Sequence, residues 1–215
     1  FISSVLDGVM PDNKLSRFIF GLNGTVAVMS SLSPAKKHLM SDLLQKIGFS
    51  KLKIVDGAHA SALSVSGGDT TQFNTTCIVD IGAQKTEIAV FSMNDLVDSK
   101  NFKWGGIKLT EALQKVSRSK HQCVVGWHLA EEAKKQVGTL KGSKKKFALP
   151  GKDLINQVSK TVVFSSDDVV AEFNKMFEDF LYNIQDFIAN LPSETAISVL
   201  ERGIFLTGGG SLLEG

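Results

Sequence analysis

Residues 22–65 alternate two patterns of apolar positions, one with the spacing of a strand and one with the spacing of a helix. β-Branched residues are frequent in Leu22–Met29, whereas the apolar positions after Ser33 and Pro34 recur at helical spacing. Serine followed by proline is a typical helix start, and Gly48 supplies a typical stop. We therefore predict a strand, a helix, a second strand and a short helix over residues 22–29, 35–47, 51–55 and 59–65.

The rest of the chain begins with the pattern of a hairpin. The apolar runs Cys77–Gly82 and Thr86–Phe91 are separated by a short turn, as in two antiparallel strands. The elements expected after them are an extended piece to residue 102, helices from 105 and over 129–137, a strand over 160–164, helices from 166 and over 194–200, and a strand over 203–207. Because strands and helices alternate, the predicted fold class is α/β.

The long helix from residue 166 has a start signal and a broad apolar face. Ser165 stands three residues before Asp168, which is a capping pattern. Phenylalanine, methionine, leucine and isoleucine then recur at helical spacing over 173–188. The face has the width of a helix packed on a sheet, so we interpret it as core and not as a membrane anchor.

Composition places the chain among ordinary globular proteins and excludes several functions. Of 215 residues, 43% are hydrophobic and 21% charged, and 24 basic side chains face 22 acidic ones. This balance gives no field that predicts nucleic acid as a partner. Cys77 and Cys123 lie far apart and form no metal-ligand or disulfide pattern, which suits a reducing cytosol. No apolar run approaches the roughly 20 residues that span a bilayer.

Two glycine turns are the candidate ligand loops. Asp80 and Gly82 lie at the end of the first hairpin strand, and Gly208, Gly209 and Gly210 follow the last predicted strand. Glycines without Cβ let a ligand approach the backbone, and a turn that leads into a helix presents free N–H groups to an anion. Either feature alone is more often an ordinary hairpin or tight turn than a ligand loop.

The order of these turns resembles a nucleotide-binding superfamily. Asp80-Ile81-Gly82-Ala83-Gln84-Lys85-Thr86 resembles its D-x-G-x-x-x-T phosphate hairpin, and Ile204–Gly210 resembles its adenosine turn. Actin, the seventy-kilodalton heat-shock proteins, sugar kinases, MreB and FtsA share both features. The resemblance implies an actin-like ATPase fold of the ribonuclease H type, here mainly the second nucleotide-binding half with an inserted helical subdomain.

The finer resemblance is to the bacterial filament protein MreB, over nearly the whole chain. The landmarks match in order. FtsA and the pilus protein PilM share the hairpin and the glycine turn but lack the landmarks at Gly151–Leu154 and Leu191-Pro192. The landmarks in this chain are Asp7–Asp12, Gly105-Gly106 with Glu111-Ala112, Gly126 with Ala130–Lys134 and Gly138, Gly151–Leu154, Lys160–Val162 with Ser165-Ser166, Leu191-Pro192 to Ile204, and the glycine turn.

The resemblance implies that ATP with Mg²⁺ is the cofactor. Glu131 and Lys134, one helical turn apart, would reach the ribose and base. Without the resemblance, these two residues are more simply an exposed helical ion pair. The other implied nucleotide-binding residues are Asp80, Gly82, Thr86, Gly208, Gly209 and Gly210, with Asp80 also facing the metal.

Departures from the family pattern make hydrolysis doubtful. Ala83, Gln84 and Lys85 stand where the family has Gly, Gly and Thr, so side chains occupy the space where bare backbone holds phosphate. Lys36 falls on the position of the glutamate that orients the attacking water, and a lysine does not polarise water in that way. No catalytic residue is identified, and at most a weak ATPase is expected.

The chain also lacks the family's first phosphate loop. It begins without an initiator methionine and stops after a glycine-rich turn, so we expect a fragment of a longer protein. The predicted organisation is a remnant of the first half or a linker over 1–20, an actin-like core over 21–116 and 160–215, and the inserted small subdomain over 117–159.

These features predict an MreB-like actin homologue that self-associates into cytoskeletal filaments for cell shape or related organisation. The expected location is the cytoplasm. If a membrane surface or a membrane protein is a partner, the expected place is the inner face of the cell membrane. The alternatives are an FtsA- or PilM-like membrane-associated adaptor, or an active ATPase or sugar-kinase-like enzyme of the same superfamily.

Overall fold

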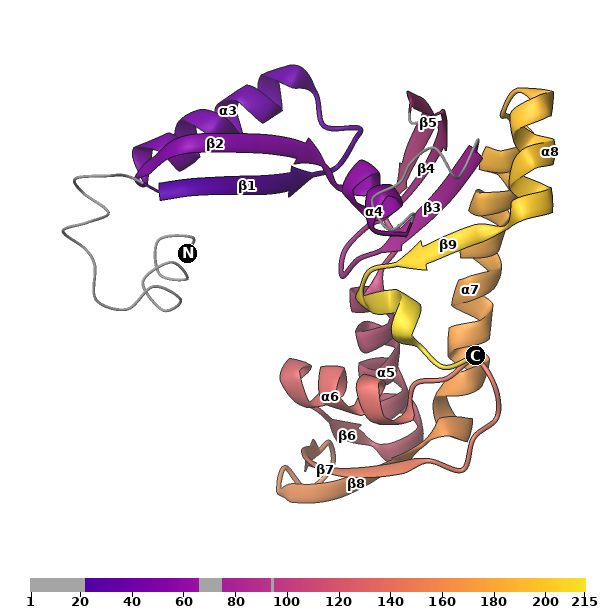
Figure 1. Cartoon of the computed structure of the whole chain (residues 1–215). Coiled ribbons are helices and arrows are strands. Elements are labelled where there is room, and N and C mark those ends of the chain that lie inside the picture. Colours follow the sequence, from indigo (N-terminus) through magenta and orange to yellow (C-terminus); the bar gives the residue numbers. More distant parts are fainter. Residues whose placement is uncertain (1–21, 66–74, 94) are drawn as a thin grey trace. The chain divides into compact units, whose positions relative to one another are not determined.

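The structure, a computed structural model, describes residues 22–65, 75–93 and 95–215. The chain forms two compact units, residues 1–72 and 73–215 (Figure 1). The landmark Asp7–Asp12 and the segment predicted over 1–20 lie outside the described residues. The predicted core over 21–116 spans both units, and the predicted division of the chain stays a prediction.

The first unit contains the four elements that its pattern predicts: β1 (Leu22–Val28), α3 (Pro34–Lys46), β2 (Phe49–Asp56) and α4 (Gly57–Val65). β1 and β2 pair in parallel, and α3 is the crossover between them. Gly48, with φ of 108°, ends α3 as predicted. Leu44 of α3 is buried, but Leu39 and Leu43 are more than half exposed, because two strands cover only a narrow stripe of the helix.

The second unit is built on a four-stranded sheet of order β5-β4-β3-β9. Its strands are β3 (Thr75–Ile81), β4 (Thr86–Ser92), β5 (Asp95–Phe102) and β9 (Ile204–Thr207). β3 and β9 are far apart in the sequence but pair in parallel, with Asp80 opposite Thr207 (Figure 1). This pairing brings the predicted phosphate hairpin and the glycine turn to the same end of the sheet.

Helices α5 (Gly106–His121), α7 (Ser166–Ala189) and α8 (Ser193–Arg202) pack with this sheet around the main core. Phe173, Phe180 and Phe187 of α7 are at most 3% exposed, which confirms that the phenylalanine-rich face is core. Trp104 stacks on Phe180 with 4.4 Å between ring centroids, and its indole N–H donates to the Met176 carbonyl oxygen. None of the described helices is long and apolar enough to cross a bilayer.

The segment 117–159 contains more strand than its sequence pattern predicts. Besides α6 (Trp127–Val137), it contributes β6 (Cys123–Val124) and β7 (Lys146–Asp153) to a sheet with β8 (Ser159–Ser165). β7 was not expected because Pro150 and Gly151 interrupt it. Proline is tolerated there because β6 pairs with β7 only at Lys152 and Asp153, so Pro150 faces no strand on that side.

Asp168 caps the start of α7 and stabilises the fold through hydrogen bonds with Ser165. The Asp168 carboxylate accepts hydrogen bonds from the Ser165 backbone N–H at 2.9 Å and the Ser165 hydroxyl at 2.7 Å. Partial burial raises the pKa of this carboxyl, but the Ser165 hydrogen bonds and Lys120 outweigh burial and hold it below its ordinary value. Asp168 therefore stabilises the fold above the unfolded-state pKa, and this contribution is lost as pH falls through the lower folded-state pKa.

Asp168→Ala is expected to lower the free energy of unfolding by about 1 kcal/mol at pH 7, which is typical of a lost helix cap. The effect should shrink toward pH 3, and denaturant unfolding at both pH values measures it. Asp167→Ala is the matched control, since Asp167 is exposed in the same turn and its side chain makes no hydrogen bond within the described residues. Equal losses from both substitutions would contradict the capping role.

Candidate functional site

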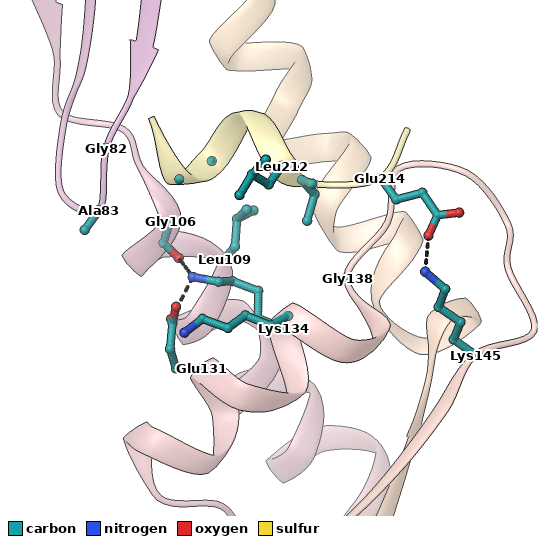
Figure 2. A pocket seen from close by; sticks show the side chains of 14 residues that line it. Gly82, Ala83, Gly106, Leu109, Glu131, Lys134, Gly138, Lys145, Leu212 and Glu214 are labelled. Atoms are coloured by element: carbon teal, nitrogen blue, oxygen red, sulfur yellow. Dashed lines mark hydrogen bonds and ion pairs between the residues drawn. The ribbon is translucent and has the colours of Figure 1, made fainter. Parts of the chain in front are cut away.

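A pocket of about 470 Å³ lies in the second unit (Figure 2). The β3–β4 turn, α5, α6 and the short 3-10 helix η2 (Gly209–Leu212) surround it. Its volume is in the range of small-molecule sites. The lining residues are Gly82, Ala83, Gly106, Leu109, Glu131, Lys134, Lys135, Gly138, Lys145, Gly209, Gly210, Leu212, Leu213 and Glu214.

The β3–β4 turn is attached to the start of α5 by backbone hydrogen bonds. The Gly106 N–H donates to the Gly82 carbonyl oxygen at 3.1 Å, and the Ile107 N–H donates to that of Ala83 at 2.8 Å. A Cβ on Gly105 would lie 2.6 Å from both of these carbonyl oxygens. Gly105 is therefore required for the close approach of the turn to the helix, and this contact positions one wall of the pocket.

The glycine turn after β9 packs on the end of β3. Gly208 has φ of 79°, and a Cβ there would collide with the Asp80 carboxylate and the Ile81 backbone. Gly210 packs against the Ile81 side chain, whereas a Cβ on Gly209 would meet no atom within 4 Å. The turn therefore needs glycine at two positions for packing, and Gly209 offers bare backbone to the pocket.

Glu131 and Lys134 of α6 form an ion pair in the pocket wall (Figure 2). The Lys134 Nζ lies 2.6 Å from Glu131 Oε2 and 3.1 Å from the Gly106 carbonyl oxygen of α5. The Lys134 side chain is only 13% exposed and that of Glu131 is 31% exposed. The pair is thus partly buried and tied to a second helix, unlike a simple surface ion pair.

The carboxyl group of Glu131 is held in its ionised form. Burial raises its pKa, but the hydrogen bonds from Lys134 and Thr110, together with the positive charges of Lys134 and Lys135, outweigh burial and lower it below the ordinary value. An ionised carboxylate only accepts hydrogen bonds, so its natural ligand partners are hydroxyl or N–H donors.

Thr110 of α5 is a contact of this pair that the sequence pattern did not reveal. Its side chain is fully buried, and its hydroxyl lies 2.5 Å from Glu131 Oε2. Threonine occurs on the buried face of many helices, so nothing in the residue type marks it. The only local signal is its place one turn after Gly106, on the helix that bounds the pocket.

The predicted site residues fall into two groups. Gly82, Glu131, Lys134, Gly209 and Gly210 line the pocket together.

Asp80, Thr86 and Gly208 lie outside this lining. Asp80 and Gly208 lie next to each other, and the fully buried Thr86 donates its hydroxyl to the Trp104 carbonyl oxygen at 2.9 Å. Their roles toward a nucleotide stay predictions.

The rim of the pocket carries a small excess of positive charge. Lys145 pairs with Glu214, and the Leu140 N–H donates to the Glu214 carbonyl oxygen at 2.7 Å. Lys135 is exposed, and its side chain makes no hydrogen bond or ion pair within the part of the chain that the structure describes. Three lysines against two glutamates favour an anionic ligand.

The pocket belongs to a chain whose sequence matches a known family model. The model described as MreB/Mbl protein matches residues 2–215. The chain belongs to the MreB/Mbl family. The curated relatives include the cell shape-determining protein Mbl of Bacillus subtilis, 23% identical over all of this chain and 69% of that protein. The cell shape-determining protein MreB of Escherichia coli is 25% identical over 87% of this chain and 54% of that protein.

Solved structures of actin-like proteins show the same fold as this MreB/Mbl family member. MreB 5 of Spiroplasma citri bound to AMPPNP superposes with a TM-score of 0.88 at 22% identity, over 99% of this chain and 64% of that one. The MamK double helical filament gives a TM-score of 0.72 at 19% identity, over 99% and 62%. The chain thus spans about half to two thirds of the length of the relatives it matches.

The departures from the MreB pattern lie at exposed positions. Ala83, Gln84 and Lys85 form the exposed tip of the β3–β4 hairpin, and only Ala83 of the three lines the pocket. Lys36 is exposed in the first turn of α3. The substituted residues therefore still form a hairpin tip between β3 and β4, and Ala83 brings a side chain to the pocket wall.

Proposed function

We propose that this chain acts as an actin-like protein of the MreB/Mbl type that binds an adenine nucleotide in the described pocket. One observation carries the proposal: five residues singled out by their resemblance to the MreB nucleotide motifs, distant in the sequence, line a single pocket of suitable volume. The MreB 5 structures with AMPPNP and with ADP support nucleotide binding in a protein of the same fold.

Each wall of the pocket suits a different part of a nucleotide. Glu131 would accept hydrogen bonds from the ribose hydroxyls, and the backbone at Gly209 and Gly210 would lie against the adenosine. The apolar side chains Leu109 and Leu212 would contact the base. Gly82 and the adjoining turn would face the phosphates, where the rim lysines provide a favourable charge.

A Mg²⁺ ion would accompany the nucleotide, and Asp80 would be the carboxylate that holds it. Beside Asp80, the Thr207 hydroxyl is buried and has no hydrogen-bond partner within the described residues. No group of three potential metal ligands gathers in the described ranges. The oxygens of Asp80 and Thr207 fit Mg²⁺, which needs only one or two protein oxygens when phosphates and waters supply the rest. When bound, the metal neutralises phosphate charge.

Hydrolysis is proposed to be weak. Lys36 stands where MreB has the glutamate that orients water, and Ala83 adds a side chain where the family has bare backbone. The nucleotide would then act mainly as a structural bridge that stabilises an assembly-competent form.

Self-association into filaments is the proposed output of nucleotide binding. The double helical filament of MamK supports assembly for this fold, and a head-to-tail contact that does not close generates a filament. We propose a role in cell shape or related organisation, in the cytoplasm at the inner face of the membrane. A membrane surface or a membrane protein would be the second partner there.

Nucleotide binding, pelleting and phosphate release, measured on the longest natural form of the protein, test this proposal together. ATP is expected to bind and to promote pelleting, with phosphate release near background. Lys36→Glu, which puts a glutamate at the MreB position, is expected to raise release at least about tenfold, a modest value for a restored water-orienting group.

Lys46→Glu is the matched control, because Lys46 is an exposed lysine in the last turn of the same helix. Fast phosphate release by the natural protein would overturn the proposed loss of hydrolysis and favour an active ATPase. Absence of both ATP binding and pelleting would overturn the proposed function as a whole.

A further inference from the structure

Thr110 connects the two helices that bound the proposed nucleotide pocket. It lies on α5, is fully buried, and places its hydroxyl oxygen 2.5 Å from Glu131 Oε2 and 3.1 Å from the Lys134 Nζ, both on α6. The same oxygen lies 3.1 Å from the Gly106 carbonyl oxygen of its own helix. The Thr110 hydroxyl therefore lies within hydrogen-bond distance of each polar group that joins α5 to α6 here.

The hydrogen-bond capacity of Lys134 is used within the protein. Its ammonium group has three N–H donors, and it has three acceptors: Glu131 Oε2, the Thr110 hydroxyl and the Gly106 carbonyl oxygen. Glu131 Oε2 in turn accepts from both Lys134 and Thr110, whereas Oε1 accepts no hydrogen bond from the described residues. The group left for a ligand is thus Oε1 of Glu131.

We propose that Thr110 is the positioning residue of the nucleotide site, holding the Glu131 carboxylate so that Oε1 receives a hydroxyl of the ribose. The inference rests on the proposed nucleotide-binding function and separates the residue that contacts the ligand from the residues that position it. Glu131 contacts the ligand, and Thr110 and Lys134 act on the ligand through Glu131. The site then selects nucleotides with an intact ribose over deoxyribose forms. A deoxyribose displaces the water that hydrogen-bonds to the Glu131 carboxylate but offers no hydroxyl to replace that hydrogen bond.

The charges around Glu131 agree with this assignment. Lys134 and Lys135 are the charged residues of its own helix that lower its pKa, and Lys145 and Glu214, also in the pocket lining, pair with each other. α5 brings no charged side chain to the pocket lining, so its contribution to Glu131 is the Thr110 hydroxyl. Removing that hydroxyl should leave the carboxylate less well stabilised and raise its pKa.

The first test compares Thr110→Val, which keeps the side-chain shape, with Thr110→Ser, which keeps the hydroxyl. The probes are ATP and 2′-deoxy-ATP, titrated against the full chain. Thr110→Val is expected to weaken ATP binding about tenfold, which is the value of a hydrogen bond to a charged group, and to reduce the preference for ATP over 2′-deoxy-ATP. Thr110→Ser is expected to restore both. An unchanged preference in Thr110→Val would overturn the inference.

The second test needs no nucleotide, and its wild-type measurement needs no valine variant. Carbon-detected NMR titration of the Glu131 carboxyl in the wild-type chain is expected to show a pKa below the ordinary value of about 4.3. Thr110→Ser should keep it low and Thr110→Val should raise it. An ordinary pKa in the wild type would overturn the positioning role even if Thr110→Val fails to fold. Failure of the wild type to bind ATP while this carboxyl titrates low would overturn the nucleotide function alone.

Discussion

Replacing Phe173 with alanine is expected to lower the free energy of unfolding of the second unit by about 3–5 kcal/mol. Phe173 is completely buried in α7, belongs to the main core, and has its ring next to Gly138 at the end of α6. Truncating a buried aromatic ring removes its favourable burial and leaves a cavity that the close-packed surroundings cannot fill. Denaturant unfolding followed by circular dichroism measures the loss.

Leu181→Ala is the matched control on the same helix. Leu181 is 52% exposed, so its truncation is expected to change stability by no more than about 0.5 kcal/mol. If Phe173→Ala left stability unchanged but reduced binding to lipid vesicles, the interpretation of this face as core would be wrong and a membrane anchor would replace it.

Gly208→Ala is expected to cost on the order of 2–3 kcal/mol of stability and to abolish nucleotide binding. The backbone at Gly208 is left-handed, and a Cβ would collide with the Asp80 carboxylate and the Ile81 backbone. Relief of the collision requires β9 to move away from β3, and this movement would displace η2 from the pocket wall. Thermal unfolding and ATP titration measure the two effects.

Gly209→Ala separates these two effects. A Cβ at Gly209 meets no protein atom within 4 Å, so stability should be nearly unchanged, whereas the added methyl group would enter space reserved for the ligand. We therefore expect weaker ATP binding at full stability. Normal ATP binding by both glycine variants would contradict the placement of the nucleotide against this turn.

Much of the secondary structure could be predicted from local patterns. The strand at 22–28, the helix that begins after Ser33, the hairpin around Gly82 and the long helix that begins after Ser165 all lie where spacing and capping residues placed them. These signals are local in the sequence, so one chain segment carries all the information that determines them.

Long-range pairing limited the rest of the fold prediction. β7 contains Pro150 and Gly151 and has no strand signal of its own, and it is a strand because β8 pairs along its length. The apolar residues of α3 recur at helical spacing as predicted, yet Leu39 and Leu43 are exposed, because the sheet that the described residues form in this unit has two strands. Apolar spacing predicts which residues share a face, and the neighbouring elements decide how much of that face is covered.

For the candidate site, the sequence by itself determined the residue types and their order: the hairpin that ends in Asp80 and Gly82, the Glu131 and Lys134 spacing, and the glycine turn. The tertiary structure decided which of them share the pocket, because the parallel pairing of β3 with β9 joins segments more than a hundred residues apart. It also decided the hydrogen-bond partners of Thr110 and Thr86. Two buried threonines with the same chemistry differ only in the partner that the fold brings to each hydroxyl, Glu131 for one and the Trp104 carbonyl for the other.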